Sequence, residues 1–306
     1  MSSDNIRNVA VAGASGIIGS KLVPLLVESG RFTVTILGRA GFTGVPPGAK
    51  VVVVDYNDQE SLFRGLRGQD AIISTLSREA TLLQIPLIDA AIRAGVKRFI
   101  PSEFGGNLKD FNLRQLPNYA NKAKVEDHLE KMSSEHGITY TYIYNNVLLD
   151  WSIEKGVLLN FQDATAHLYD GGHRAVSMTR VAAAAKAAVQ VLLHANETRN
   201  KAVRIHEIVI SQRQLLAYAK EVDAARVWQE QHVDMAELKT KLKAEHTSDV
   251  PNLGLFHAYA VKGAFGDRID NQFQEADNEL LGVEPLSIDD LKEMLAQIAG
   301  NVTRRS

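Results

Sequence analysis

The sequence predicts an α/β protein with a doubly wound parallel sheet, followed by a smaller α/β portion toward the C-terminus. Strand-like and helix-like segments alternate through the first half of the chain, which is typical of repeated βαβ units. A glycine-rich turn separates the first strand from the first helix. The alternation becomes looser after about residue 145, so we expect the two portions to meet near residue 150.

The glycine-rich turn lies in Asn8–Gly19, with the sequence NVAVAGASGIIG. The small apolar residues before it suit a strand buried on both faces. A turn with few side chains lets the backbone approach a ligand, and the helix predicted over 17–27 begins with free amides that suit phosphate oxygens. The pattern therefore predicts a dinucleotide site of the Rossmann type, formed by Gly13, Ser15, Gly16, Ile17, Ile18 and Gly19. A tight turn without a ligand is the structural alternative.

The segments that follow continue the alternation. Hydrophobic patterns predict strands at 32–37, 51–54, 70–75, 98–101 and 138–144, and helices at 58–66, 79–94 and 119–135. Asp58 is the expected N-cap of its helix, and Pro86 is expected to kink the next one. The loop over 102–117 is long for a compact domain, which favours a functional role.

The second portion is less regular. We expect a short strand at 166–169, a turn at Gly171 and Gly172, and an alanine-rich helix over 180–194. A strand over 201–208 and a helix capped by Ser211 follow. The polar stretch over 227–245 looks helical, and a final helix is expected over 288–299.

Composition excludes several classes of protein. The chain has 306 residues and a net charge of -2, and its basic residues are scattered, which argues against a nucleic-acid partner. It has no cysteine, and its histidines lack the close spacing of metal ligands. No apolar segment reaches the roughly 18 residues of a membrane span, and the N-terminus has no signal core. A cytoplasmic protein without a membrane partner is therefore expected.

Arg39 follows the second predicted strand, where a dinucleotide site reads the adenosine ribose. A carboxylate there would accept hydrogen bonds from a free 2′-hydroxyl, whereas an arginine suits a 2′-phosphate. Because no carboxylate occurs between Arg39 and Asp55, the sequence favours NADP (NADPH) over NAD, with Ser15 as a second donor to the phosphate. A solvated arginine is the alternative. Thr75 and Leu76 follow the fourth strand, where they should run along the cofactor.

Lys122 is the best candidate for acid–base chemistry. In a nicotinamide-dependent reductase the cofactor carries the hydride, and the protein supplies orientation, an acid or base and an apolar pocket. Lys122 begins a helix just after the long loop, where its amino group can contact the nicotinamide ribose and exchange a proton. A solvated helix lysine is the alternative. Tyr119 precedes it by three positions, not the four of a Tyr-x-x-x-Lys pair, and receives no role.

Several segments together resemble the isoflavone reductase-like, or NmrA-like, branch of atypical short-chain dehydrogenases. These are GASGIIG, the arginine at position 39, RFIPSEFGG (98–106), NKAKV (121–125) and GITYTYIYNN (137–146). The similarity continues through DGGHRAVSMTRVAAAAKAAV (170–189) and ETRNKAVRI (197–205), and the loops resemble those of fungal relatives. The resemblance implies an NADP-binding Rossmann domain over 1–150, to which about 175–195 returns, and a substrate domain over 151–306.

The resemblance also implies roles for individual residues. It places the family's lysine on Lys122, the phenylalanine beside the nicotinamide on Phe104, and the asparagine after the sixth strand on Asn146. Two departures stand out. The loop after the second strand is shorter than in plant enzymes and lacks a second basic residue for the phosphate, and Leu148 stands where those enzymes carry phenylalanine. The second departure implies a differently shaped substrate pocket.

Two functions remain open at this point. The first is an NADPH-dependent reductase of a small apolar metabolite of aromatic, phenolic or quinone-like character, whose pocket would include Leu148, Trp151 and Met178. Core packing is the alternative for these three side chains. The second function is a non-catalytic NADP-sensing regulator that acts through a protein partner. An epimerase is disfavoured because the expected region has no Tyr-x-x-x-Lys. Both a monomer and a homodimer are compatible with the sequence.

Overall fold

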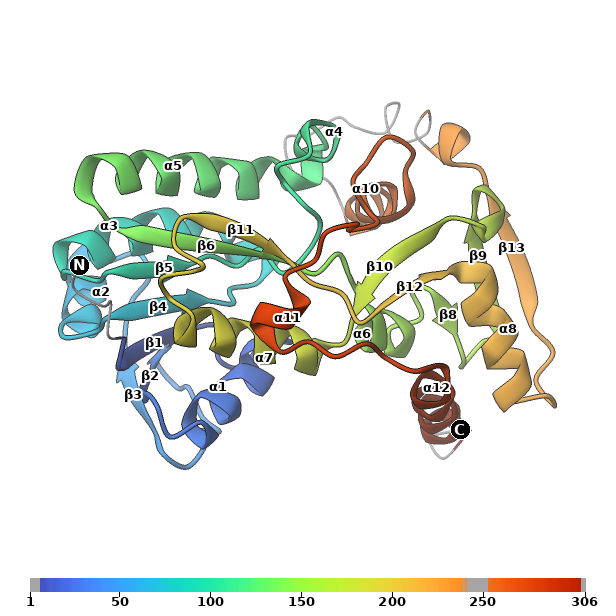
Figure 1. The fold of residues 1–306 in the computed structure, drawn as a ribbon, viewed down its shortest axis with the longest axis horizontal. Coiled ribbons are helices and arrows are strands. Elements are labelled where there is room, and N and C mark those ends of the chain that lie inside the picture. Colours follow the sequence, from blue (N-terminus) through green and yellow to red (C-terminus); the bar gives the residue numbers. More distant parts are fainter. Residues whose placement is uncertain (1–5, 239, 241–252, 304–306) are drawn as a thin grey trace.

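The computed structural model describes residues 6–238, 240 and 253–303 (Figure 1). Its centre is a seven-stranded parallel sheet with the order β11-β6-β5-β4-β1-β2-β3. Read from the other end, the six strands β3-β2-β1-β4-β5-β6 reproduce the strand order of doubly wound dinucleotide-binding folds, and β11 extends the sheet beyond β6. The predicted fold class is therefore confirmed.

The strands of the central sheet are short and mostly buried. They are β1 (Asn8–Ala12), β2 (Thr33–Gly38), β3 (Ala49–Val53), β4 (Ala71–Ser74), β5 (Arg98–Ile100), β6 (Thr139–Tyr144) and β11 (Lys201–Arg204). β1 lies between β2 and β4, and its last residue, Ala12, pairs with Leu37 and Ser74. The loops that leave these three strands therefore meet at one edge, which we call the carboxyl edge.

Helices cover both faces of this sheet (Figure 1). On one face α1 (Gly19–Glu28) packs against α7 (Val181–Leu193), and on the other α2 (Gln59–Leu66) packs against α3 (Gln84–Arg93), which packs against α5 (Ala120–His136). Since α7 and β11 come after residue 180, the second half of the chain completes the large sheet and its helical layer. The short helix α4 (Phe111–Arg114) lies in the loop before α5.

The remaining elements form a smaller portion beside the carboxyl edge (Figure 1). One small sheet contains β7 (Val147–Leu148), β10 (Ala175–Thr179) and β12 (Ile208–Ser211), and another contains β8 (Leu159–Asn160), β9 (Thr165–Tyr169) and β13 (Gln229–Val233). The helices here are α6 (Leu149–Glu154), α8 (Gln212–Val222), α10 (Leu253–Phe265) and α12 (Ile288–Thr303), whereas α11 (Asn278–Leu281) packs against α7. Across the described ranges, no helix combines the length and apolar character needed to cross a bilayer.

The two helix N-caps that the sequence predicts are confirmed by the structure. The Asp58 side chain accepts a hydrogen bond from the Glu60 amide at 2.9 Å, and Ser211 forms a capping box with Gln214 at the start of α8. Pro86, however, does not kink a long helix. The segment begins as a 3₁₀ helix (Arg78–Leu83), and Pro86 lies in the first turn of α3, where its missing amide removes no helical hydrogen bond.

Two other expectations were wrong. The single strand expected over 201–208 is two strands, β11 and β12, which belong to different sheets. The stretch over 227–245 was expected to be helical throughout, but its first part contains β13, whose backbone pairs with β9, while Trp228 just before it packs edge-on against Phe161 at 5.0 Å. Residues 235–238 and 240 are helical, as expected. Pairing and packing with distant segments outweigh the helical character of a polar sequence. Residues 241–245 of that stretch lie outside the described residues.

Candidate functional site at the carboxyl edge

The glycine turn packs tightly against the end of β4. Gly13 has φ +84°, and a Cβ atom there would lie 2.5 Å from the Thr75 carbonyl oxygen. A Cβ on Gly19 would lie 2.3 Å from the Gly13 oxygen. The Thr75 hydroxyl donates to the carbonyls of Ala12 and Gly13 at 3.0 and 2.9 Å. The glycines are therefore required for contact between the turn and β4, and Thr75 fixes the turn's position.

The turn also leaves backbone amides available at the start of α1. No side chain of the described chain caps the helix, which begins at Gly19 directly after the turn. Ser15 is exposed and Ile17 is 45% exposed, whereas Ile18 is buried in the core beneath them. An uncapped helix start at the carboxyl edge of a parallel sheet can bind an anionic phosphate group. The residues present therefore fit a dinucleotide.

Arg39 follows β2 at the same edge and is exposed. Its charge lies close enough to Tyr56 to oppose the effect of burial, which raises the pKa of that phenol. The Tyr56 hydroxyl donates to the Leu37 carbonyl at 3.0 Å and so ties the end of β2 in place. Ser15 and Arg39 thus follow neighbouring strands, as the ribose-phosphate hypothesis requires.

The segment after β5 continues alongside β6. Gly105 pairs with Tyr144 in parallel, and its carbonyl accepts the amides of Asn145 and Asn146 at 3.0 and 2.9 Å. Phe104 and Asn146 have φ values of +36° and +50°, in the left-handed region that non-glycine residues rarely adopt. Such conformations cluster at functional sites, where neighbouring contacts maintain them.

The Asn146 side chain connects this segment to the smaller portion. Its amide nitrogen donates to the carbonyls of Ser177 and Asn271, each at 3.0 Å. On the other side of the segment, the Ser102 hydroxyl donates to the Leu76 carbonyl at 2.8 Å. The loops after β4, β5 and β6 are therefore linked to one another and to the smaller portion.

Lys122 lies in the first turn of α5 and reaches into the carboxyl edge. Its Nζ donates a hydrogen bond to the Glu103 carbonyl oxygen and lies 3.6 Å from the Glu103 Oε2. Its side chain is 23% exposed, whereas Lys124 is exposed to solvent. A Cβ on Gly105 would lie 3.7 Å from the Lys122 Nζ. The amino group is therefore held in place beside the Phe104–Gly105 backbone.

Glu103 was missed in the sequence, where its only signal was its place one residue before Phe104. Its carboxylate oxygens are buried, and in the described structure they have an ion-pair partner in Lys122 but no hydrogen-bond partner. Burial raises the pKa of Glu103 to about 7, against the opposing charge of Lys122. Glu103 also contributes to a raised pKa of about 12 at Tyr119, which is caused mainly by burial. A carboxyl group that titrates near neutrality therefore lies beside the candidate acid–base lysine.

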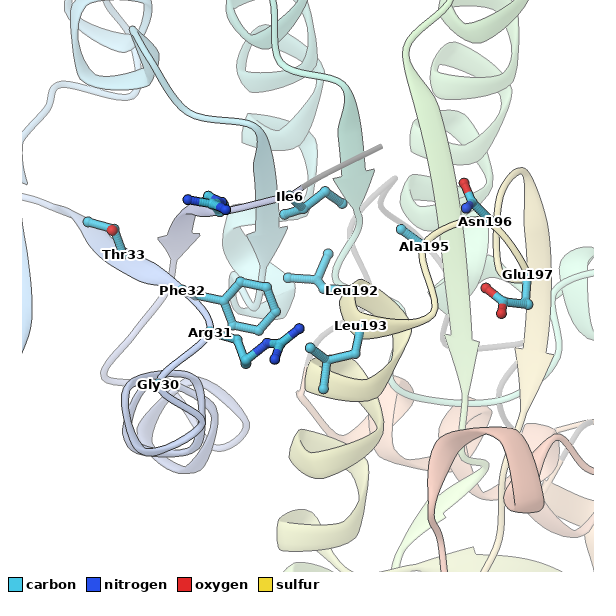
Figure 2. A pocket seen from close by; sticks show the side chains of 11 residues that line it. Ile6, Gly30, Arg31, Phe32, Thr33, Leu192, Leu193, Ala195, Asn196 and Glu197 are labelled. Atoms are coloured by element: carbon cyan, nitrogen blue, oxygen red, sulfur yellow. The ribbon is translucent and has the colours of Figure 1, made fainter. Parts of the chain in front are cut away.

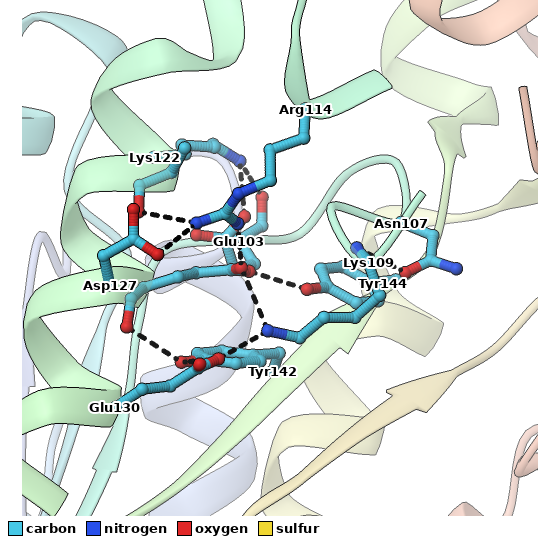
Figure 3. A network of polar contacts seen from close by, with 11 residues as sticks. Glu103, Asn107, Lys109, Arg114, Lys122, Asp127, Glu130, Tyr142 and Tyr144 are labelled. Carbon is cyan, nitrogen blue, oxygen red and sulfur yellow. Dashed lines mark hydrogen bonds and ion pairs between the residues drawn. The ribbon is translucent and has the colours of Figure 1, made fainter. Parts of the chain in front are cut away.

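A neighbouring carboxyl group, Glu126, is bound very differently, and its partners Arg114, Lys109 and Tyr144 are seen in Figure 3. It is fully buried on α5 and accepts hydrogen bonds from Tyr144, Arg114 and Lys109 at 2.6, 2.8 and 3.3 Å. Glu130 extends this network through Lys109. The network fixes α5 against β6 and the loop, and it therefore fixes the origin of the Lys122 side chain.

Two of the candidate substrate residues, Leu148 and Trp151, share a core cluster with Phe104, the residue expected beside the nicotinamide. Phe104, Leu148 and Trp151 are partly buried and pack against the same core cluster, which contains α1 and α7. Met178 is instead fully buried in the core of the smaller portion, so its side chain offers no surface to a ligand. The expectation that Met178 lines the pocket is corrected: it is a core residue.

A cavity of about 730 Å³ lies at the opposite edge of the sheet (Figure 2). It opens between the segment before β2, including Arg31 and Phe32, and the end of α7 at Leu192 and Leu193. A smaller cavity is lined by residues that precede β5 and β6, including Lys97 and Ile138, at the same amino edge. Neither contains a predicted site residue, so the candidate site is assigned from chemistry and strand topology, not from cavity size.

Known proteins share both the sequence pattern and the fold. The NmrA-like family model matches residues 6–291. The oxidoreductase aprR of Aspergillus flavus is 31% identical over 92% of this chain and 96% of its own length, and the oxidoreductase poxI of Penicillium oxalicum is 28% identical over 94% and 93%. A complex of leucoanthocyanidin reductase with NADPH from Vitis vinifera has a TM-score of 0.74 at 22% identity, covering 96% of this chain and 99% of that one. The family match confirms the resemblance seen in the sequence: the chain belongs to the NmrA-like family.

Proposed function

We propose that the protein is an NADPH-dependent reductase of a small apolar metabolite with aromatic, phenolic or quinone-like character. The observation that carries this proposal is the position of Lys122, whose amino group is partly buried and bound to the Glu103 carbonyl at the carboxyl edge. An amino group held at this place can both contact the nicotinamide ribose and donate a proton to a substrate, which a reductase requires. The relatives' names, oxidoreductase aprR and oxidoreductase poxI, support the same conclusion.

The cofactor part of the proposal assigns two groups of residues. The turn and the start of α1 would bind the pyrophosphate, and Ser15 and Arg39 the 2′-phosphate. Bound there, the nicotinamide supplies a hydride. The nicotinamide half would lie along the loops that leave β4, β5 and β6, against Thr75, Leu76, Phe104, Lys122 and Asn146. The NADPH complex of leucoanthocyanidin reductase supports this choice of cofactor.

The substrate part rests on Phe104, Leu148 and Trp151, which are partly buried and pack against the same core cluster. Their partly buried apolar side chains would accept a flat apolar ring and exclude water from the reacting atoms. A related solved structure contains NADP+ and (+)pinoresinol, an aromatic ligand, with a TM-score of 0.71 at 17% identity. Lys122 then donates a proton to the substrate oxygen that becomes negative as the hydride arrives.

Cofactor binding and turnover test the proposal together. Purified protein is titrated with NADPH and NADH by nucleotide fluorescence, and NADPH oxidation is then followed with quinones, enones, aryl ketones and phenylpropanoid-type compounds. We expect tighter binding of NADPH and oxidation with at least one class. NADPH binding without oxidation by any class would instead support a regulator, and preferred binding of NADH would contradict the role of Arg39.

A further inference from the structure

Glu103 and Lys122 form a pair of titratable groups that neither solvent nor other hydrogen bonds fully satisfy. The Glu103 side chain is 1% exposed, and its carboxylate oxygens have no hydrogen-bond partner in the described structure. The Lys122 Nζ, at 3.6 Å from Oε2, is within one small side-chain movement of a direct hydrogen bond. An ammonium group has three N–H donors, and the Glu103 carbonyl uses one. One donor can turn to the Glu103 carboxyl, and one remains for a ligand.

The charged and titratable groups around Glu103 come from each element packed against it. Lys122 and Glu126 face it from α5, and Lys109 and Tyr119 from the loop on either side of α4. Tyr142 and Tyr144 face it from β6. The two lysines favour the ionised carboxylate, whereas burial and Glu126 favour the neutral acid. Because burial is the largest of these effects, Glu103 can retain a proton near neutral pH.

We propose that Glu103 is a positioning residue that shares a proton with Lys122 and resupplies it during reduction. The inference rests on the proposed reductase function. As hydride reaches the substrate carbon, the Lys122 ammonium gives one proton to the substrate oxygen and becomes a neutral amine. The Glu103 carboxylic acid then returns a proton to that amine, and the resulting carboxylate regains a proton from solvent. The substrate gains one hydride and one proton, and the pair returns to its starting state.

The pH dependence of turnover provides the first test. In the wild-type protein, kcat/KM with NADPH and an accepted substrate should fall as pH rises through about 7, where Glu103 ionises. Glu103→Gln keeps the shape of the side chain but cannot donate its proton through ionisation. We expect at least a tenfold lower kcat, an unchanged KM for NADPH and no decline across pH 6–8, whereas Glu103→Asp should restore the decline. Identical pH profiles for the wild-type protein and Glu103→Gln would overturn the proposal.

Thermal unfolding provides a second test that needs no substrate. Because folding raises the pKa of Glu103 above its ordinary value of 4.5, the neutral acid stabilises the folded state at low pH, and this contribution is lost as pH rises through about 7. The Tm of Glu103→Gln relative to wild type should therefore increase between pH 5 and pH 8. In a Lys122→Met background the midpoint of this increase should move to higher pH, since the opposing charge is absent.

Glu207 provides the matched control. It is also a buried glutamate with a cationic partner, Arg180 at 2.6 Å, but it belongs to the junction of β10, β12 and α7. Glu207→Gln should leave the pH profile of kcat/KM and the Glu103 midpoint unchanged. A wild-type protein that reduces none of the compounds would contradict the proposed function. The thermal unfolding data would still test whether Glu103 and Lys122 are coupled. A midpoint that is the same with and without Lys122 would overturn the pairing itself.

Discussion

The two edges of the central sheet satisfy their polar groups in opposite ways. At the amino edge Arg98 is fully buried, and its guanidinium donates hydrogen bonds at 2.6 to 3.3 Å to Thr139, Thr141, Thr198 and the Ala195 carbonyl. At the carboxyl edge Glu103 is also buried, but its carboxylate has no hydrogen-bond partner in the described structure. The backbone differs as well, since Phe104 and Asn146 adopt left-handed conformations there.

This difference separates a buried charge that stabilises the fold from a buried carboxyl group at the candidate site. The Arg98 side chain joins β5 and β6 to the end of α7, and its internal partners compensate for the cost of burying a charge. An unsatisfied carboxyl group and left-handed backbone both cost stability. They persist at the carboxyl edge because the surrounding network of Glu126, Arg114 and Lys109 fixes the structure around them. Changes at the two edges should therefore separate stability from activity.

Replacing Lys122 should produce the largest effect. Lys122→Ala removes the proposed proton donor, so kcat/KM for NADPH-dependent reduction should fall by about 10²- to 10⁴-fold, the range typical of general acid–base catalysis. The Tm should change by only a few degrees, because the side chain is at the edge of the core. Steady-state kinetics and thermal unfolding measure the two quantities.

Lys124→Ala is the control for that change. Lys124 lies two positions further along α5 and is exposed, so its loss should leave kcat/KM within about twofold of wild type, as is usual for exposed side chains. Equal losses in the two variants would show that the charge of α5, and not the placed amino group of Lys122, governs the reaction.

The parts of the fold that depend on neighbouring residues could be predicted from the sequence. The buried strand before Gly13, the cap at Asp58 and the capping box at Ser211 are encoded within a few positions, and the structure confirms each. β13 and the division between β11 and β12 could not be predicted in the same way. Their conformations depend on pairing with β9, β6 and β10, whose paired residues lie 30 to 64 positions away in the chain.

The candidate site shows the same limit. Arg39 and Lys122 could be found because their chemistry is visible in their position after a strand or at the start of a helix. Glu103 could not, because a glutamate in a loop is usually solvated, and here α5 and β6 bury it. Met178 was expected in the pocket, but β10 is buried along nearly its whole length and Met178 lies in the core of the smaller portion.

Replacing Arg98 should have the opposite effect to replacing Lys122: it should lower stability and leave activity almost unchanged. Arg98→Met keeps a long side chain but removes every donor, which leaves the buried Ala195 carbonyl without this hydrogen bond. Loss of a buried partner of this kind costs about 1–3 kcal/mol. The Tm should fall by several degrees, while the Kd for NADPH and the kcat of the folded fraction should stay within about twofold of wild type. A kcat loss as large as that of Lys122→Ala would contradict the separation between the edges.

Arg39 and Arg31 give the finest comparison, because they flank opposite ends of the same strand. Arg39 follows β2 at the carboxyl edge, whereas Arg31 precedes β2 and lines the cavity at the amino edge (Figure 2). Hydrogen bonds from an arginine to a phosphate contribute about 1.5–3 kcal/mol, so Arg39→Asp should raise the Kd for NADPH by about 10- to 150-fold. Its Kd for NADH should stay the same or fall, because a carboxylate can accept hydrogen bonds from a free 2′-hydroxyl.

Arg31→Asp makes the same change of charge and should alter neither Kd by more than about twofold, since a screened surface charge acts weakly beyond one Debye length. Similar losses of NADPH affinity in both variants would mean that net charge, and not a 2′-phosphate site formed by Arg39, determines the cofactor preference.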